Sequence, residues 1–222
     1  GDVYKRQAVG NPYGDGYYDD FNTAVGLDSA GRTQLHHKGK LVIGVENTPT
    51  VIFDLMQFLV IDLGGVVGQI GMGQHGTAFA HAGMRMGPAI CYEGLYGDFY
   101  GDFVRRGAQF MAIISNDGWW GDTPGYKHLF TISRLRAIEH RRAIARSANT
   151  GMSGFISARG DIGETLGWEK RGVISAAVPL NSELTFYTRY GDYLGRISEY
   201  LTLLCVLYYI AYRVKRKNYL VK

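Results

Sequence analysis

The sequence has little cysteine and proline, and it lacks an apolar stretch near its first residue. Two cysteines, Cys91 and Cys205, occur in 222 residues, too few for the disulfide framework of a small secreted domain. Cys205 lies in an apolar run, where we expect a buried, inert thiol. Residues 1–7 are polar and the first residue is not methionine, so we expect an incomplete chain rather than a signal peptide.

Several kinds of binding motif are also missing. The six histidines show no HExxH or comparable spacing, so we expect no metal. Glycine-containing runs such as DLGGVVGQIG lack the spacing of a phosphate-binding loop, so we expect no cofactor. The net charge of +4 is mild and gathers near the C-terminus, which disfavours a nucleic-acid partner.

Predicted strands and helices alternate between residues 21 and 178, which indicates an α/β architecture. The stretches 21–27 and 32–37 form a hairpin around the turn 28–31. Further strands are predicted at 85–91, 109–115, 152–157 and 172–178, and helices at 94–107 and 127–146. The second helix is predicted to place five apolar residues close to one face: Leu129, Ile132, Leu135, Ile138 and Ala145.

Two apolar segments suggest contact with a membrane. Residues 50–74 are rich in large apolar side chains, including Phe53 and Phe58, but contain two aspartates and several glycines. This mixture favours a buried core segment or an arm lying on a bilayer over a spanning helix. The uncharged run 200–212 ends in tyrosines and precedes a basic cluster. It is typical of a membrane anchor with a cytoplasmic C-terminus, although a buried or amphipathic helix is the alternative.

Cys91 stands where a predicted strand meets a predicted helix, in the string GPAICYEG. A thiol at a helix N-terminus is favoured as thiolate, and nearby N–H groups such as that of Tyr92 can hold an oxyanion. A cysteine at a strand end is also commonly a structural core thiol. Position alone leaves both interpretations open.

Four motifs in a fixed order decide between them: HHKGKLVIGVE, GPAICYEG, ISNDGWWG and RLRAIEHRRAIARSANTG. Together they resemble the apolipoprotein N-acyltransferase family of the nitrilase superfamily. The resemblance runs from about residue 18 to the C-terminal helix. It implies a nitrilase-like αββα sandwich, incomplete at its N-terminus and followed by one transmembrane helix. The implied domains are residues 1–192 for catalysis, 193–214 for the membrane helix and 215–222 for a basic cytoplasmic tail.

The resemblance also assigns roles to particular residues. Cys91 matches the nucleophile that becomes acylated, and Lys38 matches the catalytic lysine, with Lys40 as the competing assignment. A cation beside the nucleophile stabilises both thiolate and oxyanion. Glu46 and Glu93 match supporting glutamates, which pair with the lysine or hold loops. The family's triad glutamate lies upstream of the hairpin and has no counterpart here, so we expect this polypeptide alone to be inactive.

Other residues in the motifs receive weaker assignments. Trp119 and Trp120 resemble an aromatic loop at the mouth of the site, with core packing as the alternative. Asn116 and Asp117 are expected to shape a turn. The arginines of the predicted 127–146 helix and its surroundings are expected on a solvated or ion-paired face, helped by Glu139; they are Arg134, Arg136, Arg141, Arg142 and Arg146.

The implied reaction moves an acyl chain from a membrane phospholipid to the N-terminal diacylglyceryl-cysteine of an apolipoprotein through a Cys91 thioester. The implied location is the bacterial inner membrane, with the catalytic domain facing the periplasm. Two alternatives remain: a nitrilase-type amidase that hydrolyses a carbon–nitrogen bond, and a catalytically dead, membrane-tethered binding module.

Overall fold

The computed structural model describes residues 5–10, 18–42, 46 and 70–220. Its strands are β1 (Lys5–Gly10), β2 (Tyr18–Leu27), β3 (Thr33–His37), β4 (Phe79–His81), β5 (Met84–Ile90), β6 (Phe110–Ser115), β7 (Ile144–Ala148), β8 (Ser153–Ile156) and β9 (Ile162–Leu166). Its helices are α2 (Gly97–Arg105), α3 (Pro124–His140), α4 (Phe186–Tyr190) and α5 (Tyr193–Leu220), with 3₁₀ turns η1 (Cys91–Leu95) and η2 (Gly118–Trp120).

The predicted hairpin is confirmed as strands β2 and β3. They pair antiparallel from Thr23 opposite His37 to Leu27 opposite Thr33. The Asp28 carboxylate closes the turn by accepting the N–H groups of Ala30 and Arg32, both at 2.9 Å. Strand β1, which we had not predicted, pairs antiparallel with β2 and completes a three-stranded sheet.

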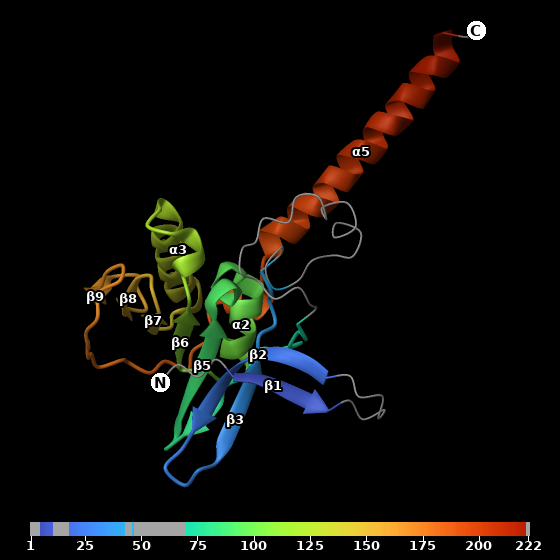
Figure 1. The fold of residues 1–222 in the computed structure, drawn as a ribbon. Helices are drawn as coiled ribbons and strands as arrows, with labels where there is room; N and C mark the ends of the chain where they lie inside the picture. Colours follow the sequence, from blue (N-terminus) through green and yellow to red (C-terminus); the bar gives the residue numbers. More distant parts are fainter. Residues whose placement is uncertain (1–4, 11–17, 43–45, 47–69, 221–222) are drawn as a thin grey trace.

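The second sheet has six strands in the order β4-β5-β6-β7-β8-β9. Strands β5, β6 and β7 are parallel to one another, and the outer pairs are antiparallel. This mixed sheet with flanking helices confirms the predicted α/β class (Figure 1). Parallel strands present their carboxyl ends at one edge, so the segments after β5, β6 and β7 meet there.

One hydrophobic core lies between this sheet and helices α2 and α3. Its central members are Ala89, Tyr100, Phe103, Val104, Met111, Ile113, Phe130, Ala137, Ile144 and Ile156. The three-stranded sheet joins the larger one at β4, where the Gln34 side chain bonds both the N–H and the carbonyl of Ala80. The core therefore fixes the sheet edge that carries Cys91.

The helix predicted at 127–146 is too long. Helix α3 ends at His140 because Arg141 turns into the left-handed region, with φ 51°, and caps it. The residues from Ile144 onward pair with β6 as strand β7, so sheet formation overrides their helical spacing. The predicted apolar face is also wrong, since Leu135 and Ile138 are exposed. The face that packs inward is partly polar: Tyr126, Leu129, Phe130, Ser133, Arg136, Ala137 and His140.

The strand predicted at 152–157 is confirmed as β8, but the one predicted at 172–178 is not present. Residues 172–178 form a loop, and Val173 is 95% exposed. A strand requires a neighbour for its N–H and carbonyl groups. None of the described strands lies alongside this stretch, and β9 is the partner of β8 instead.

Helix α5 leaves the body as one long helix (Figure 1). Within the described residues, its segment Tyr193–Arg213 is the one helix long and apolar enough to cross a membrane, and none of it is buried. The expectation that Cys205 is buried is wrong, because the thiol is exposed on this unpacked helix. The predicted apolar arm at 50–74, with Phe53 and Phe58, lies outside the described residues except for its last five positions.

Candidate active site

Cys91 follows the buried end of β5 and begins the turn η1. Its backbone lies in the left-handed region, with φ 46°, which costs a non-glycine residue roughly 1–2 kcal/mol. Such strain concentrates at functional sites, and a sharp strand-to-helix turn is a known way to present a nucleophile. The residue is half-buried, so it is not sealed in the core.

Glu93 ties the Cys91 turn to the segment that carries Lys38. Its carboxylate is fully buried and accepts the N–H of Ile90 at 2.6 Å and the N–H of Gly39 at 2.6 Å. Ile90 precedes Cys91, and Gly39 follows Lys38. One carboxylate thus holds the backbone next to Cys91 and the backbone next to Lys38, the two residues predicted to carry the chemistry.

Lys38 is buried and paired with Glu46. Its Nζ lies 2.8 and 2.7 Å from the two Glu46 carboxylate oxygens, and the lysine is 2% exposed. Glu46 also accepts the N–H of Val42 at 2.8 Å and the side-chain amide of Asn22. An ammonium group has three donors, and within the part of the chain that the structure describes two of them are used, both by Glu46.

Lys40 has a different environment. Its ammonium lies 5.3 Å from the ring centroid of Tyr96 and 5.4 Å from that of Phe99, in cation–π range. Tyr96 in turn packs edge-on against Tyr92, with ring centroids 5.5 Å apart. Burial, followed by a hydrogen bond with Tyr92, raises the pKa of the Tyr96 hydroxyl. Tyr92 and Lys40 thus belong to an aromatic surface next to Cys91, whereas Lys38 lies inside.

The residues after β6 do more than shape a turn. Asp117 is fully buried, and both its oxygens accept Nη2 of Arg146, at 2.9 and 2.8 Å. Asn116 accepts the Gly118 N–H at 3.2 Å, as a turn residue does. Arg146 is therefore ion-paired, as one of the two expectations has it, but the pair is buried and does not lie on a helix face.

Arg142 is a second buried arginine, and it lies outside the helix. Its guanidinium donates to the carbonyls of Ala108, His140, Arg141 and Glu183. Glu139 could pair within a helix with Arg136 or Arg142, each three residues away, and it pairs with Arg136, with 3.1 Å between nitrogen and oxygen. The charge pattern indicated the ion pair but not which arginines the fold would bury.

Trp119 and Trp120 form the turn η2 at the same sheet edge as Cys91. They are 55% and 47% exposed, so the core-packing alternative is excluded. The Trp120 ring lies against Gly125, where an added Cβ would come within 2.6 Å of it. The ring therefore covers the first turn of α3.

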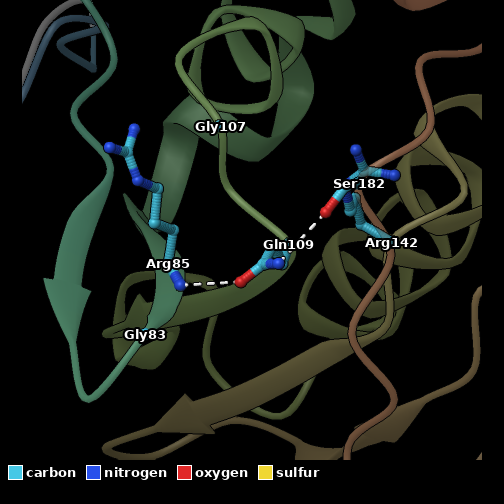
Figure 2. A pocket seen from close by; sticks show the side chains of 6 residues that line it. All are labelled: Gly83, Arg85, Gly107, Gln109, Arg142 and Ser182. Atoms are coloured by element: carbon cyan, nitrogen blue, oxygen red, sulfur yellow. Dashed lines mark hydrogen bonds between the residues drawn. The ribbon is translucent and has the colours of Figure 1, made fainter.

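A pocket of about 320 Å³ lies at the opposite edge of the sheet (Figure 2). Its lining comes from residues just before or at the start of β5, β6 and β7, together with Ser182. Gln109 bridges it, accepting the Arg85 N–H at 2.9 Å and donating to the Ser182 hydroxyl at 3.0 Å. None of the predicted site residues lines this pocket.

Two further residues of the site were not predicted. His36 is buried, and its Nε2 lies 3.1 Å from both Glu93 oxygens. Asn22 binds Glu46 through its side chain and accepts the Lys38 N–H at 2.8 Å through its carbonyl. Residues two apart on a strand share a face, so the spacing of His36 and Lys38 was the available signal. No local signal marks Asn22.

No metal site is evident in the described part of the chain, where no three His, Cys, Asp or Glu side chains are grouped to hold an ion. The candidate site consists of a half-buried cysteine, a buried lysine and the carboxylates that hold them.

Comparison with known proteins gives the site a context. The family model for carbon-nitrogen hydrolases matches residues 4–184. An apolipoprotein N-acyltransferase from Chlorobaculum tepidum is 36% identical over 181 residues, which are 79% of this chain and 34% of that protein. One from Verminephrobacter eiseniae is 34% identical over 178 residues, covering 77% of this chain and 32% of that protein. The chain thus spans about a third of the length of these relatives.

Solved structures of similar fold come from the nitrilase superfamily. Saccharomyces cerevisiae Nit3 has a TM-score of 0.52 and 18% identity, over 72% of this chain and 53% of that one. An amidase from Nesterenkonia sp. AN1, with acrylamide added at its active-site cysteine, has a TM-score of 0.51 and 14% identity, over 82% of this chain and 63% of that one. Identities this low show a shared fold alone.

Proposed function

The chain belongs to the carbon-nitrogen hydrolase family and has a nitrilase-like α/β fold, and from this we propose that it is the catalytic part of an apolipoprotein N-acyltransferase. In this proposal Cys91 takes an acyl chain from a membrane phospholipid. It then passes the chain to the N-terminal amine of a diacylglyceryl-cysteine. The relatives at 36% and 34% identity carry that name.

The observation that carries the proposal is the Glu93 bridge. A single buried carboxylate accepts the backbone N–H groups beside Cys91 and beside Lys38. A nucleophile in a strained turn and a buried cation are thus held by one group, as a preorganised site requires. A structural cysteine would need neither the strain nor the bridge.

The first step forms a thioester. The Cys91 thiol loses its proton to a base, which the family resemblance assigns to a glutamate upstream. The thiolate sulfur attacks the ester carbonyl carbon of the phospholipid and gives a tetrahedral oxyanion. As the intermediate collapses, the carbon–oxygen bond breaks, and the leaving oxygen takes the proton and departs as lysophospholipid.

Lys38 stabilises the charge that develops in this step. Its two hydrogen bonds to Glu46 fix the ammonium in place. Its third N–H has no partner among the described residues and is available to the oxyanion. Because the lysine is buried, the interaction is less screened by water than at a surface. Glu46 orients the ammonium, with Asn22 and Val42 holding Glu46 in turn.

The second step releases the acyl chain. The α-amine of the acceptor attacks the thioester carbonyl, an amide forms, and the Cys91 thiolate leaves and takes up a proton. Two covalent half-reactions through one site give ping-pong kinetics. The donor is already an ester, so the reaction requires no cofactor.

The proposal places α5 in a membrane. Tyr193–Arg213 is long and apolar enough to cross one, and basic residues follow it. A basic flank favours the cytoplasmic side. The catalytic domain would therefore lie on the periplasmic side of the inner membrane. A reporter fused after Lys222 of the full-length protein should give a cytoplasmic signal; a periplasmic one would contradict this orientation.

The chemistry is tested by mixing the full-length protein with phospholipid and no amine acceptor. Mass spectrometry should then find a hydroxylamine-sensitive acyl adduct on Cys91. The Cys91→Ala variant should form none, whereas the matched control Cys205→Ala should form as much as wild type. An enzyme that forms no adduct with phospholipid but hydrolyses simple amides would refute acyl transfer and favour the amidase alternative.

A further inference from the structure

Helix α4 has two faces of opposite character. Its inner face, at Thr188, is fully buried. Its outer face carries Phe186, 61% exposed, and Tyr190, 55% exposed. A helix of five residues that exposes two large rings on one side and buries a threonine on the other is unusual for a simple linker. The exposed side therefore requires an explanation.

The exposed rings pack against a half-buried ring at the start of α5. The centroids of Phe186 and Tyr190 are 4.6 Å apart, and those of Phe186 and Tyr193 are 5.1 Å apart. Tyr193 is the first residue of α5. The three rings thus form one aromatic cluster that runs without interruption into the exposed apolar surface of that helix.

The inner face fixes this cluster to the catalytic body. The Thr188 hydroxyl bonds Nδ1 of buried His140 at 2.9 Å, and its carbonyl accepts Arg105 at 3.0 Å. The Thr185 hydroxyl donates to the Glu139 carbonyl at 2.6 Å. His140 also bonds the carbonyl of Gly97, the first residue of α2. The cluster is therefore held in a fixed relation to the helix that follows the Cys91 turn.

The length of α5 indicates where the cluster lies. Its apolar segment Tyr193–Arg213 has 21 residues and, at ~1.5 Å per residue, spans about 32 Å, close to the ~30 Å hydrocarbon core of a bilayer. The start of α5 then lies where the hydrocarbon core meets one headgroup layer. Arg196 supports this position, because its guanidinium donates back to the Tyr190 carbonyl, away from the apolar segment.

We infer that Phe186, Tyr190 and Tyr193 form a membrane-interface anchor that lies in the lipid headgroup layer and, through Thr188, holds the Cys91 edge of the sheet at a set distance from the bilayer. The inference rests on the proposed membrane location of α5. Amphipathic aromatic rings prefer this layer. The exposed charged neighbours Arg189 and Asp192 fit a hydrated layer and not the hydrocarbon core.

Site-specific photocrosslinking tests the inference in the full-length protein. Benzoylphenylalanine, a close relative of phenylalanine, replaces Phe186 in one variant, Leu204 in a second and Val173 in a third. Leu204 lies within the apolar segment of α5. Val173 is an exposed apolar residue on the loop that follows β9, and β9 lies away from α5 in Figure 1. Each protein is reconstituted in vesicles of phosphatidylethanolamine and phosphatidylglycerol and illuminated.

We expect a lipid adduct through the headgroup or glycerol at position 186, an adduct through the acyl chain at 204, and none at 173. An adduct at 204 with none at 186, or a peptide adduct at 186, overturns the anchor while α5 remains a membrane helix. No adduct at 204 or 186 overturns both. Thioester formation at Cys91, measured in the same vesicles, tests the proposed chemistry independently of the anchor.

Discussion

The two edges of the parallel strands differ in how they use a buried cation. At the amino edge, Arg142 is 1% exposed and donates to four backbone carbonyls. At the carboxyl edge, Lys38 is 2% exposed, and its ammonium donates to Glu46 alone among the described residues. The pocket opens at the first edge, whereas Cys91 lies at the second. Burial of a charge therefore does not distinguish the two edges, but the partners do: backbone carbonyls hold Arg142, and a carboxylate holds Lys38.

The largest expected effect comes from Lys38. In the full-length protein, Lys38→Ala should slow formation of the Cys91 thioester by roughly 10²–10³-fold, because the oxyanion loses a preorganised donor. Single-turnover kinetics with phospholipid measure this rate directly. Lys40→Ala is the matched control and should have a much smaller effect, since that ammonium lies over aromatic rings. Equal losses in the two variants would reverse our assignment.

A second variant tests whether the carboxyl edge depends on the hydrogen bond between His36 and Glu93. His36→Phe can still pack against Phe103, whose ring centroid is 4.8 Å away, but it removes one donor from buried Glu93. We expect stability to fall by about 2 kcal/mol, as for loss of a hydrogen bond to a charged group, and kcat to fall more than KM rises.

The conservative variant distinguishes positioning from simple packing. His36→Gln keeps an N–H donor near Glu93 and should recover a large part of kcat. If Phe and Gln at this position behave alike, His36 fills space and does not position Glu93.

What the sequence predicted well depends on local signals. The hairpin β2–β3 follows from a turn whose Asp28 bonds its own neighbours, and β5 from a short apolar run. The helix predicted at 94–107 is confirmed as α2, except that its first residues belong to the turn η1. Each of these elements is decided by residues close together in the chain.

The errors arise where distant contacts decide. The end of α3 depends on Arg141 adopting a left-handed backbone and on β6 pairing with the residues that follow. The Glu93 bridge joins residues 54 and 57 positions away, so the role of His36 could not be read from spacing alone. Family motifs named Cys91, Lys38 and Glu46, but only folding shows which charges become buried.

At the amino edge, removal of the buried cation should affect stability and not catalysis. Arg142→Leu leaves four carbonyls without their donor, and we expect a loss of about 3 kcal/mol in unfolding free energy. The rate of thioester formation per folded molecule should stay at the wild-type value. Arg85→Ala, at the exposed wall of the same pocket, should change stability by less than about 0.5 kcal/mol. A lowered kcat in folded Arg142→Leu would show that the two edges are coupled.

The smallest effect at neutral pH is expected from His140, next to Arg142 in space and sequence. Burial, followed by repulsion from Arg136, lowers the pKa of its imidazole to about 3, whereas an unfolded histidine titrates near ~6.5. Between these values the unfolded chain binds a proton that the folded protein does not. Stability therefore falls as pH drops from about 6.5 towards 3, by up to ~1.4 kcal/mol per pH unit, and is unaffected above that range. His140→Gln should flatten this part of the pH profile of thermal unfolding, while His128→Gln, on the exposed side of the same helix, should leave it unchanged. An unaltered slope in His140→Gln would mean that other groups cause the acid instability.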